Sequence, residues 1–116
     1  MPITYQLTIH LYAPVQVTVG RLGECHFPAG RYIYTGSAKR NLEARIARHL
    51  SKKPKRMHWH IDYLLAVPQV GIVGVECFCE PECLLNQRVQ GAMVVPRFGA
   101  SDCRFGCGSH LKLLTQ

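Results

Sequence analysis

Residues 3–11 alternate strictly between apolar and polar side chains, and this pattern restricts the fold more than any other feature of the chain. Because successive side chains of a β-strand point to opposite faces, the alternation predicts a strand with one buried face. Valines 15, 17 and 19 repeat the pattern, and residues 31–36 (Arg-Tyr-Ile-Tyr-Thr-Gly) have the composition of a third strand. The connections are too short for crossover helices, so we expect these three segments to form an antiparallel meander.

Helices are expected in three later segments. The first should run from about Ala38 to Ser51, with Ser37 as its N-cap, because apolar residues recur there every four positions. Residues 57–66 predict a second helix, and a third is expected from Glu82 to about Gln90, where Pro81 precedes and Gly91 follows. Residues 70–78 are rich in β-branched side chains and predict a fourth strand.

Length and composition favour one α+β domain over the 116 residues, with about three to four antiparallel strands and about three helices. Its C-terminal part, from about residue 92, carries several cysteines. Hydrophobic residues make up 47% of the chain, but no apolar run approaches the ~20 residues of a transmembrane helix. The N-terminus has no basic stretch followed by an apolar one, so we expect a cytoplasmic protein without a signal peptide.

Positive charge is concentrated in one segment. Residues 39–56 hold eight basic residues and one acid, which accounts for the whole net charge of +7. A local cationic patch on a neutral body is typical of a protein that binds a phosphate backbone. The alternative is a solvated helix end that serves solubility. The basic residues are Lys39, Arg40, Arg45, Arg48, Lys52, Lys53, Lys55 and Arg56.

Several chemically active side chains are expected at one edge of the sheet. Arg45 and His49 are four residues apart and therefore share a face of the first helix. Tyr5 lies on the apolar face of the first strand, and Tyr34 comes near the end of the third. Each of these residues could instead be an ordinary packing residue with a satisfied hydrogen bond. Trp59, next to the basic segment, is either a core residue or a stacking platform for an unpaired base.

Residues 34–38 (Tyr-Thr-Gly-Ser-Ala), followed by residues 42–50 with Arg45 and His49, resemble the second half of the GIY-YIG nuclease signature. The first tripeptide would fall on residues 3–5 (Ile-Thr-Tyr), where Ile and Thr replace the usual Gly and Ile. The chain looks like an uncharacterised branch of that superfamily, a domain of unknown function sometimes found beside DNA-repair domains. The resemblance covers nearly the whole chain and implies a GIY-YIG-like fold.

The resemblance implies a divalent-metal-dependent endonuclease that hydrolyses DNA phosphodiester bonds in repair or processing. Glu82 would hold one Mg²⁺ or Mn²⁺, with Glu80 as the nearby competitor. Arg45 would clamp the phosphate, and Tyr5 would orient or deprotonate the attacking water. The other catalytic candidates are Tyr34, which would hydrogen-bond the phosphate or the water, and His49, which would orient a tyrosine or relay a proton.

The partner expected from charge and resemblance is nucleic acid, most simply DNA. Its contacts would come from Lys39, Arg40, Arg48, Lys52, Lys53, Lys55 and Arg56. One alternative is a non-catalytic nucleic-acid-binding module with the same fold. Another is a small structural or interaction domain whose C-terminal lobe is held by cysteines.

The cysteines allow a second metal site. Cys77, Cys79 and Cys83 are spaced C-x-C-x3-C, and Cys103, Cys107 and His110 are spaced C-x3-C-x2-H. Four of these residues could enclose a zinc ion, for which Cys and His are the usual ligands. Neither half contains the C-x2-C spacing of common zinc sites, and free thiols are the default in a reducing compartment. Zinc at the cysteines is therefore an alternative to free thiols or a disulfide, and is not the favoured one.

Overall fold

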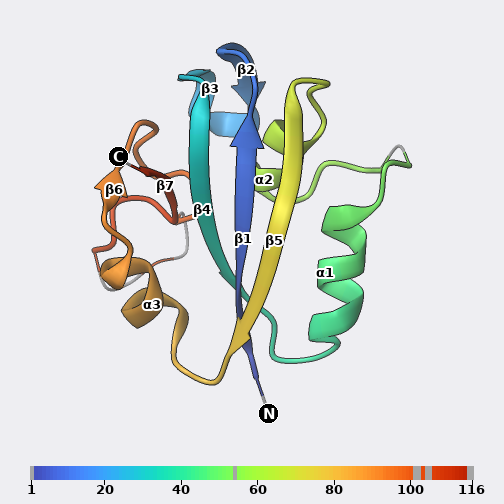
Figure 1. Cartoon of the computed structure of the whole chain (residues 1–116), viewed down its shortest axis with the longest axis vertical. Coiled ribbons are helices and arrows are strands. Elements are labelled where there is room, and N and C mark those ends of the chain that lie inside the picture. Colours follow the sequence, from blue (N-terminus) through green and yellow to red (C-terminus); the bar gives the residue numbers. More distant parts are fainter. Residues whose placement is uncertain (1, 54, 101–102, 104–105, 115–116) are drawn as a thin grey trace.

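The alternating segment at the start of the chain forms β1 (Thr4–Leu11), which lies inside a five-stranded antiparallel sheet (Figure 1). It pairs on one side with β4 (Gly30–Ser37) and on the other with β5 (Val70–Phe78). Beyond β4 the sheet continues through β7 (Leu111–Leu114) to β6 (Gly91–Ala92). The computed structural model describes residues 2–53, 55–100, 103 and 106–114. Within these ranges, the predicted α+β class with antiparallel sheets and three α-helices is confirmed.

The expected meander of three consecutive strands is wrong. β2 (Val15–Val19) pairs with β3 (Gly23–Phe27) in a separate two-stranded sheet, joined by the 3-10 turn Gly20–Leu22. β3 was not predicted, although its residues also alternate: Cys25 and Phe27 are buried while the residues between and before them are exposed. Once β3 takes β2 as its partner, β1 is free to pair directly with β4.

The helices are shorter than predicted. α1 (Leu42–Leu50) begins four residues late, because Asn41 adopts the left-handed conformation with φ 55° and Ser37 still belongs to β4. α2 (His60–Leu65) loses its predicted first three residues, and α3 (Glu82–Arg88) ends two residues early. In Figure 1, α1 lies beside the edge strand β5 and α3 lies near the other edge strand, β6. Among the described residues the longest helix, α1, has nine residues, so none has the length to cross a bilayer.

The core lies on the face of β1 that carries the odd-numbered residues. Tyr5, Leu7, Ile9 and Leu11 are at most 1% exposed, while the even positions from Gln6 to His10 are half-buried on the other face. Alternation therefore predicted correctly which side chains of β1 are buried. The buried face belongs to the hydrophobic core, together with residues of β3, α2 and the segment before β7. Among these residues are Phe27, Ile61, Leu64 and Phe98.

Candidate functional site

A pocket of about 370 Å³ opens at the end of the sheet where β1 begins and β4 ends. We call it the sheet-end pocket. Four of the five residues predicted to be catalytic line it: Tyr5 from β1, Tyr34 from β4, Arg45 from α1 and Glu82 from α3. The fifth, His49, lies one contact deeper, against Tyr5. The convergence expected at one edge of the sheet is therefore present.

Gly36 makes room for the two tyrosines. It sits directly opposite Tyr5 in the antiparallel pairing of β1 with β4. A Cβ at this position would lie 2.6 Å from Tyr5 Oη, closer than non-bonded atoms approach, and 3.1 Å from Tyr34 Cε2, which is a tight contact. Only glycine therefore leaves both phenols in place.

Tyr5 and His49 form a buried hydrogen-bonded pair. Tyr5 Oη lies 2.7 Å from His49 Nε2, and both side chains are at most 3% exposed. Burial raises the pKa of Tyr5, and the nearby Arg45 guanidinium opposes this without reversing it. Burial also lowers the pKa of His49 to about 4. Both groups are therefore neutral at pH 7, and one hydrogen bond joins them, whose donor depends on the tautomer of His49. Within the described residues, His49 Nδ1 has no hydrogen-bond partner.

Tyr34 is also held neutral. Burial, followed by the neighbouring Tyr5, raises its pKa well above the ordinary value. Its ring lies 6.3 Å from that of Tyr5 and packs edge-on against Phe98, at 6.5 Å. Neither tyrosine is therefore ionised at neutral pH. Orienting a water or a phosphate needs only the neutral phenol, whereas Tyr5 can accept a proton only if it passes its own proton on.

Arg45 is fixed at the side of the pocket by two contacts. Its Nη1 donates to the carbonyl oxygen of Ser37 at 2.7 Å, and its guanidinium carbon lies 4.3 Å from the centroid of the Trp59 ring. A guanidinium carries five N–H groups, so donors remain for an anionic ligand. Trp59 lines the same pocket, and Arg48 contacts its ring as well, at 4.7 Å. The sequence had offered Trp59 only as core or stacking platform, and its cation–π contacts were not predicted.

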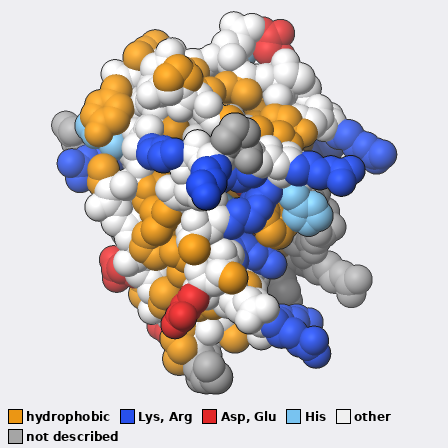
Figure 2. Space-filling view, turned by 90° about the vertical axis from the view of Figure 1, so that its right-hand side faces the viewer, with side chains coloured by type: hydrophobic (Ala, Val, Ile, Leu, Met, Phe, Trp, Pro, Cys, Tyr) orange, Lys and Arg blue, Asp and Glu red, His pale blue; other side chains and the backbone are white. Residues whose placement is uncertain are grey.

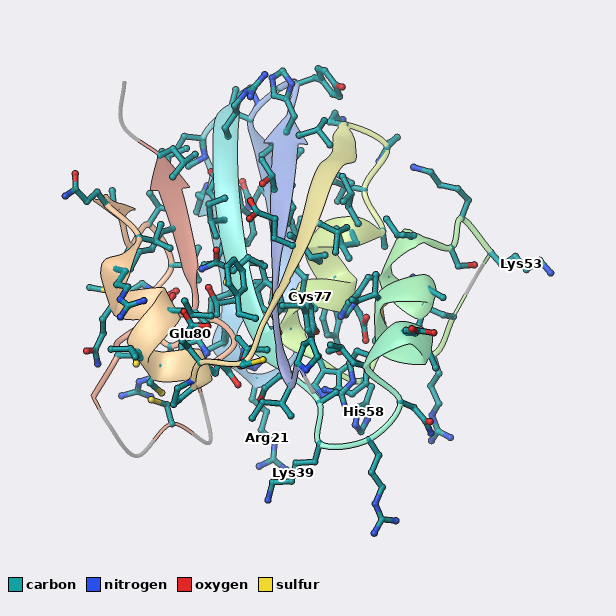
Figure 3. The ribbon with its side chains drawn as sticks, turned by 60° about the horizontal axis from the view of Figure 1, so that its bottom comes forward. Arg21, Lys39, Lys53, His58, Cys77 and Glu80 are labelled. Carbon is teal, nitrogen blue, oxygen red and sulfur yellow. The ribbon has the colours of Figure 1, made fainter. Side chains whose placement is uncertain are left out.

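Glu82 lines the same pocket, and both of its carboxylate oxygens have partners. Ser37 Oγ donates to Oε1 at 2.5 Å, and Oε2 forms an ion pair with His110 Nδ1. Burial opposes ionisation of Glu82, but the hydrogen bonds from His110 and Ser37 outweigh it and hold its pKa below the ordinary value. The predicted competitor, Glu80, is 44% exposed and pairs with Arg88 at 3.6 Å. Figure 3 looks onto this end of the molecule, with Glu80 beside the start of α3.

A second group of side chains adjoins this wall of the pocket. Cys83, Cys103, Cys107 and His110 place one ligand atom each within 4.8 Å of one another. We call them the cysteine–histidine cluster, and it could bind a metal ion. Cys77 and Cys79 are exposed and lie outside it. Of the six candidate zinc ligands that the sequence predicts, four come together in the structure. They are the last cysteine of the C-x-C-x3-C segment and all three residues of the C-x3-C-x2-H segment.

A family model described as "Domain of unknown function DUF123" matches residues 4–116 of the chain. The chain belongs to the DUF123 family. The assignment to the GIY-YIG nuclease superfamily is wrong, because the matching model is that of DUF123 and no comparison points to GIY-YIG proteins. No match was found among curated proteins or among solved structures. What the DUF123 domain does must therefore be argued from its own residues.

The basic residues of this DUF123 domain divide into two groups. Arg48 donates to the buried carboxylate of Asp62 at 2.7 Å and to the carbonyl of Arg56 at 2.7 Å, and Lys55 Nζ donates to the carbonyl of Arg48 at 2.5 Å. Arg48 and Lys55, which the sequence predicts as nucleic-acid contacts, therefore already donate hydrogen bonds to groups of the protein itself. Figure 2 shows Lys and Arg side chains gathered on the face that carries α1. The exposed ones, called the basic surface below, are Lys39, Arg40, Lys52, Lys53 and Arg56.

Two pocket contacts of the DUF123 domain were missed by the sequence reasoning. Ser37 was predicted to cap a helix, but it ends β4 and its hydroxyl binds Glu82. His110 was considered only as a metal ligand, but its Nδ1 also pairs with Glu82. Because 27 residues separate Glu82 from His110, no local pattern could have signalled this pair.

Proposed function

We propose that this DUF123 domain binds nucleic acid, most simply DNA, through its basic surface and hydrolyses a phosphodiester bond in the sheet-end pocket. The observation that carries the proposal is the convergence of Arg45, ionised Glu82 and the Tyr5–His49 pair around one pocket. Lys39 follows the pocket residue Ser37 by two positions and projects from the same end of the molecule (Figure 3). Lys39 thus places one residue of the basic surface at the end of the molecule where the pocket opens.

Substrate binding would rest on charge and on the geometry of Arg45. The exposed basic residues attract the phosphate backbone without reading base sequence. Arg45 is held by Ser37 and Trp59, so its remaining N–H groups can grip two phosphate oxygens at once. Lysine carries a charge of the same sign but lacks this forked geometry.

Proton transfer would fall to the Tyr5–His49 pair. The attacking water forms the new P–O bond and passes a proton to Tyr5 Oη, while the phenolic proton of Tyr5 moves to His49 Nε2 along their 2.7 Å contact. The bond from phosphorus to the leaving oxygen breaks, and that oxygen takes a proton from solvent. Because burial lowers the pKa of His49 to about 4, the imidazolium returns the proton to Tyr5 Oη while Tyr5 releases its own proton to solvent in the pocket, and both groups are neutral again. Tyr34 would donate to a phosphate oxygen.

Glu82 fits one place in the coordination shell of Mg²⁺ or Mn²⁺. A carboxylate offers about four lone-pair sites, of which Ser37 and His110 use two, and Mg²⁺ commonly takes one or two carboxylates together with water and phosphate oxygens. When bound, such an ion would neutralise charge that develops on the phosphate. The thiols of the cysteine–histidine cluster are soft ligands and favour Zn²⁺ over Mg²⁺.

The proposal is tested by incubating the purified protein with labelled branched, nicked, duplex and single-stranded DNA, in Mg²⁺, Mn²⁺ or EDTA. We expect metal-dependent cleavage of at least one substrate. Arg45→Lys should retain binding within a few-fold and lose cleavage by ~10²-fold or more, since a single ammonium cannot replace the forked contact. Tyr5→Phe should also bind normally and cleave slowly.

Arg31→Lys is the matched control for Arg45→Lys, because Arg31 is exposed at the far end of β4 from the pocket. It should cleave like the wild type. Binding without cleavage of any substrate would leave the non-catalytic binding module as the function. Equal cleavage by the wild type and both pocket variants would refute the assignment of the site.

A further inference from the structure

Two distances between donor atoms of the cysteine–histidine cluster are close to those between zinc ligands, and all its donor atoms lie within 4.8 Å of one another. Cys83 Sγ lies 3.5 Å from Cys103 Sγ and 3.9 Å from His110 Nε2. With Zn–S near 2.3 Å and Zn–N near 2.05 Å, a tetrahedron has edges of about 3.8 Å between two sulfurs and about 3.6 Å between sulfur and nitrogen. A disulfide would instead place the two sulfurs about 2.05 Å apart. The cluster therefore has room for an ion at its centre.

The same four residues connect two parts of the fold. Cys83 belongs to α3, Cys103 and Cys107 belong to the segment between β6 and β7, and His110 directly precedes β7. Within the described residues, the segment from 93 to 110 contains no helix or strand. Loops longer than about 12–15 residues without secondary structure are uncommon in compact domains, and those that occur often serve a function. An ion bound by four protein ligands would tie this segment to α3.

His110 has the two contacts of a zinc-bound histidine. Its Nε2 faces Cys83 Sγ at 3.9 Å, and its Nδ1 pairs with the Glu82 carboxylate. Histidines that bind zinc through one ring nitrogen usually donate from the other to a carboxylate or carbonyl, which fixes the ring and its tautomer. His110 is 2% exposed, so its orientation is set by these contacts rather than by solvent.

We propose that Cys83, Cys103, Cys107 and His110 hold one Zn²⁺, with Glu82 as the carboxylate that orients His110. Four protein ligands complete a tetrahedral shell, so the ion is structural and leaves no place for water or substrate. Three thiolates and one imidazole select zinc over the hard cations that carboxylates prefer. The ion also fixes one wall of the sheet-end pocket, because His110 holds Glu82 in place there.

The zinc assignment is tested by the metal content of the untagged 116-residue chain, purified under reducing conditions. We expect one zinc per chain by elemental analysis, and cobalt substitution should give the charge-transfer and d–d bands of a tetrahedral thiolate site. Cys107→Ser should lose the zinc or bind it far more weakly. Cys79→Ser is the matched control, because Cys79 is an exposed cysteine outside the cluster, and it should retain one zinc.

Three results would overturn the assignment. One is a zinc-free protein that takes up neither zinc nor cobalt when titrated. Another is an intact mass two hydrogens below that of the reduced chain after a parallel purification without reductant, which would mean a disulfide. The third is full zinc content in Cys107→Ser. If Cys107→Ser fails to fold, the cobalt spectrum of the wild type still decides the question.

The role of Glu82 is tested by competition for zinc with a chromophoric chelator. Glu82→Gln should retain all four ligands but bind zinc about 10- to 100-fold more weakly, as loss of such a carboxylate typically does. Glu80→Gln should bind zinc as the wild type does. Unchanged affinity in Glu82→Gln would refute the orienting role. Of this inference, only the link between the zinc ion and the pocket rests on the proposed function. A protein that binds zinc but cleaves no DNA would refute the proposed function alone. A protein that cleaves DNA without zinc would refute the zinc site alone.

Discussion

Replacing Gly36 with alanine should destabilise the domain by crowding the two tyrosines of the pocket. The new Cβ would lie 2.6 Å from Tyr5 Oη and 2.7 Å from Tyr5 Cζ, where contacts below 3.0 Å force a neighbour to move. Tyr5 is 1% exposed and bonded to His49, so it cannot swing into solvent without losing that bond. Forcing an extra methyl group into a packed site typically costs about 1–3 kcal/mol, and we expect a value at the upper end.

Gly74→Ala provides the matched control in the neighbouring strand β5. A Cβ there would meet only Thr8, at 3.6 Å, which is ordinary van der Waals contact. Its backbone is compatible with alanine, so the free energy of unfolding should stay the same or rise by about 0.4–1 kcal/mol. Urea unfolding of both variants measures the difference. Equal stability of Gly36→Ala and Gly74→Ala would refute the packing argument for the pocket.

Three further predictions concern charge. The folded-state pKa of His49 lies near 4, below its unfolded value of 6.5, so its contribution to stability is complete above pH 6.5 and falls by about 3 kcal/mol as the pH drops toward 4. Urea unfolding of the wild type against His49→Gln measures this, and parallel pH profiles would contradict it. Arg48→Ala should lower the free energy of unfolding by about 3 kcal/mol, because it removes the ion-pair partner of the fully buried Asp62 carboxylate and leaves it only the backbone hydrogen bonds from His58 and Trp59. The same urea assay checks it, with exposed Arg40→Ala expected to be near neutral. Lys53→Ala should reduce the log–log salt slope of duplex binding by about 0.9, which titration at several salt concentrations would measure, and an unchanged slope would remove Lys53 from the interface.

Short-range patterns predicted much of this molecule. Alternation identified the buried face of β1 and placed Tyr5 on it, and the four-residue spacing put Arg45 and His49 on one helix face. These inferences succeeded because each depends only on the repeat of a single element. They also brought the right groups to the pocket, since Tyr5 and Arg45 both line it.

Strand pairing and side-chain partners across the sheet were not predictable in the same way. β1 pairs with β4 because the intervening hairpin folds upon itself, and nothing within residues 4–11 encodes that choice. The contact of Glu82 with His110 depends on β7 lying next to β4, where His110 comes beside the start of α3. The internal use of Arg48 likewise depends on Asp62 of another helix.

Metal-dependent DNA cleavage by Glu82→Gln and Glu80→Gln, compared in one assay, tests the central claim most directly. Both variants remove one carboxylate charge near the same end of α3, but only Glu82 lines the pocket. The assay uses the substrate that the wild type cleaves fastest, with DNA affinity and zinc content measured on the same preparations. We predict that Glu82→Gln binds DNA but loses cleavage, while Glu80→Gln cleaves like the wild type. Equal cleavage by the two variants would contradict the account.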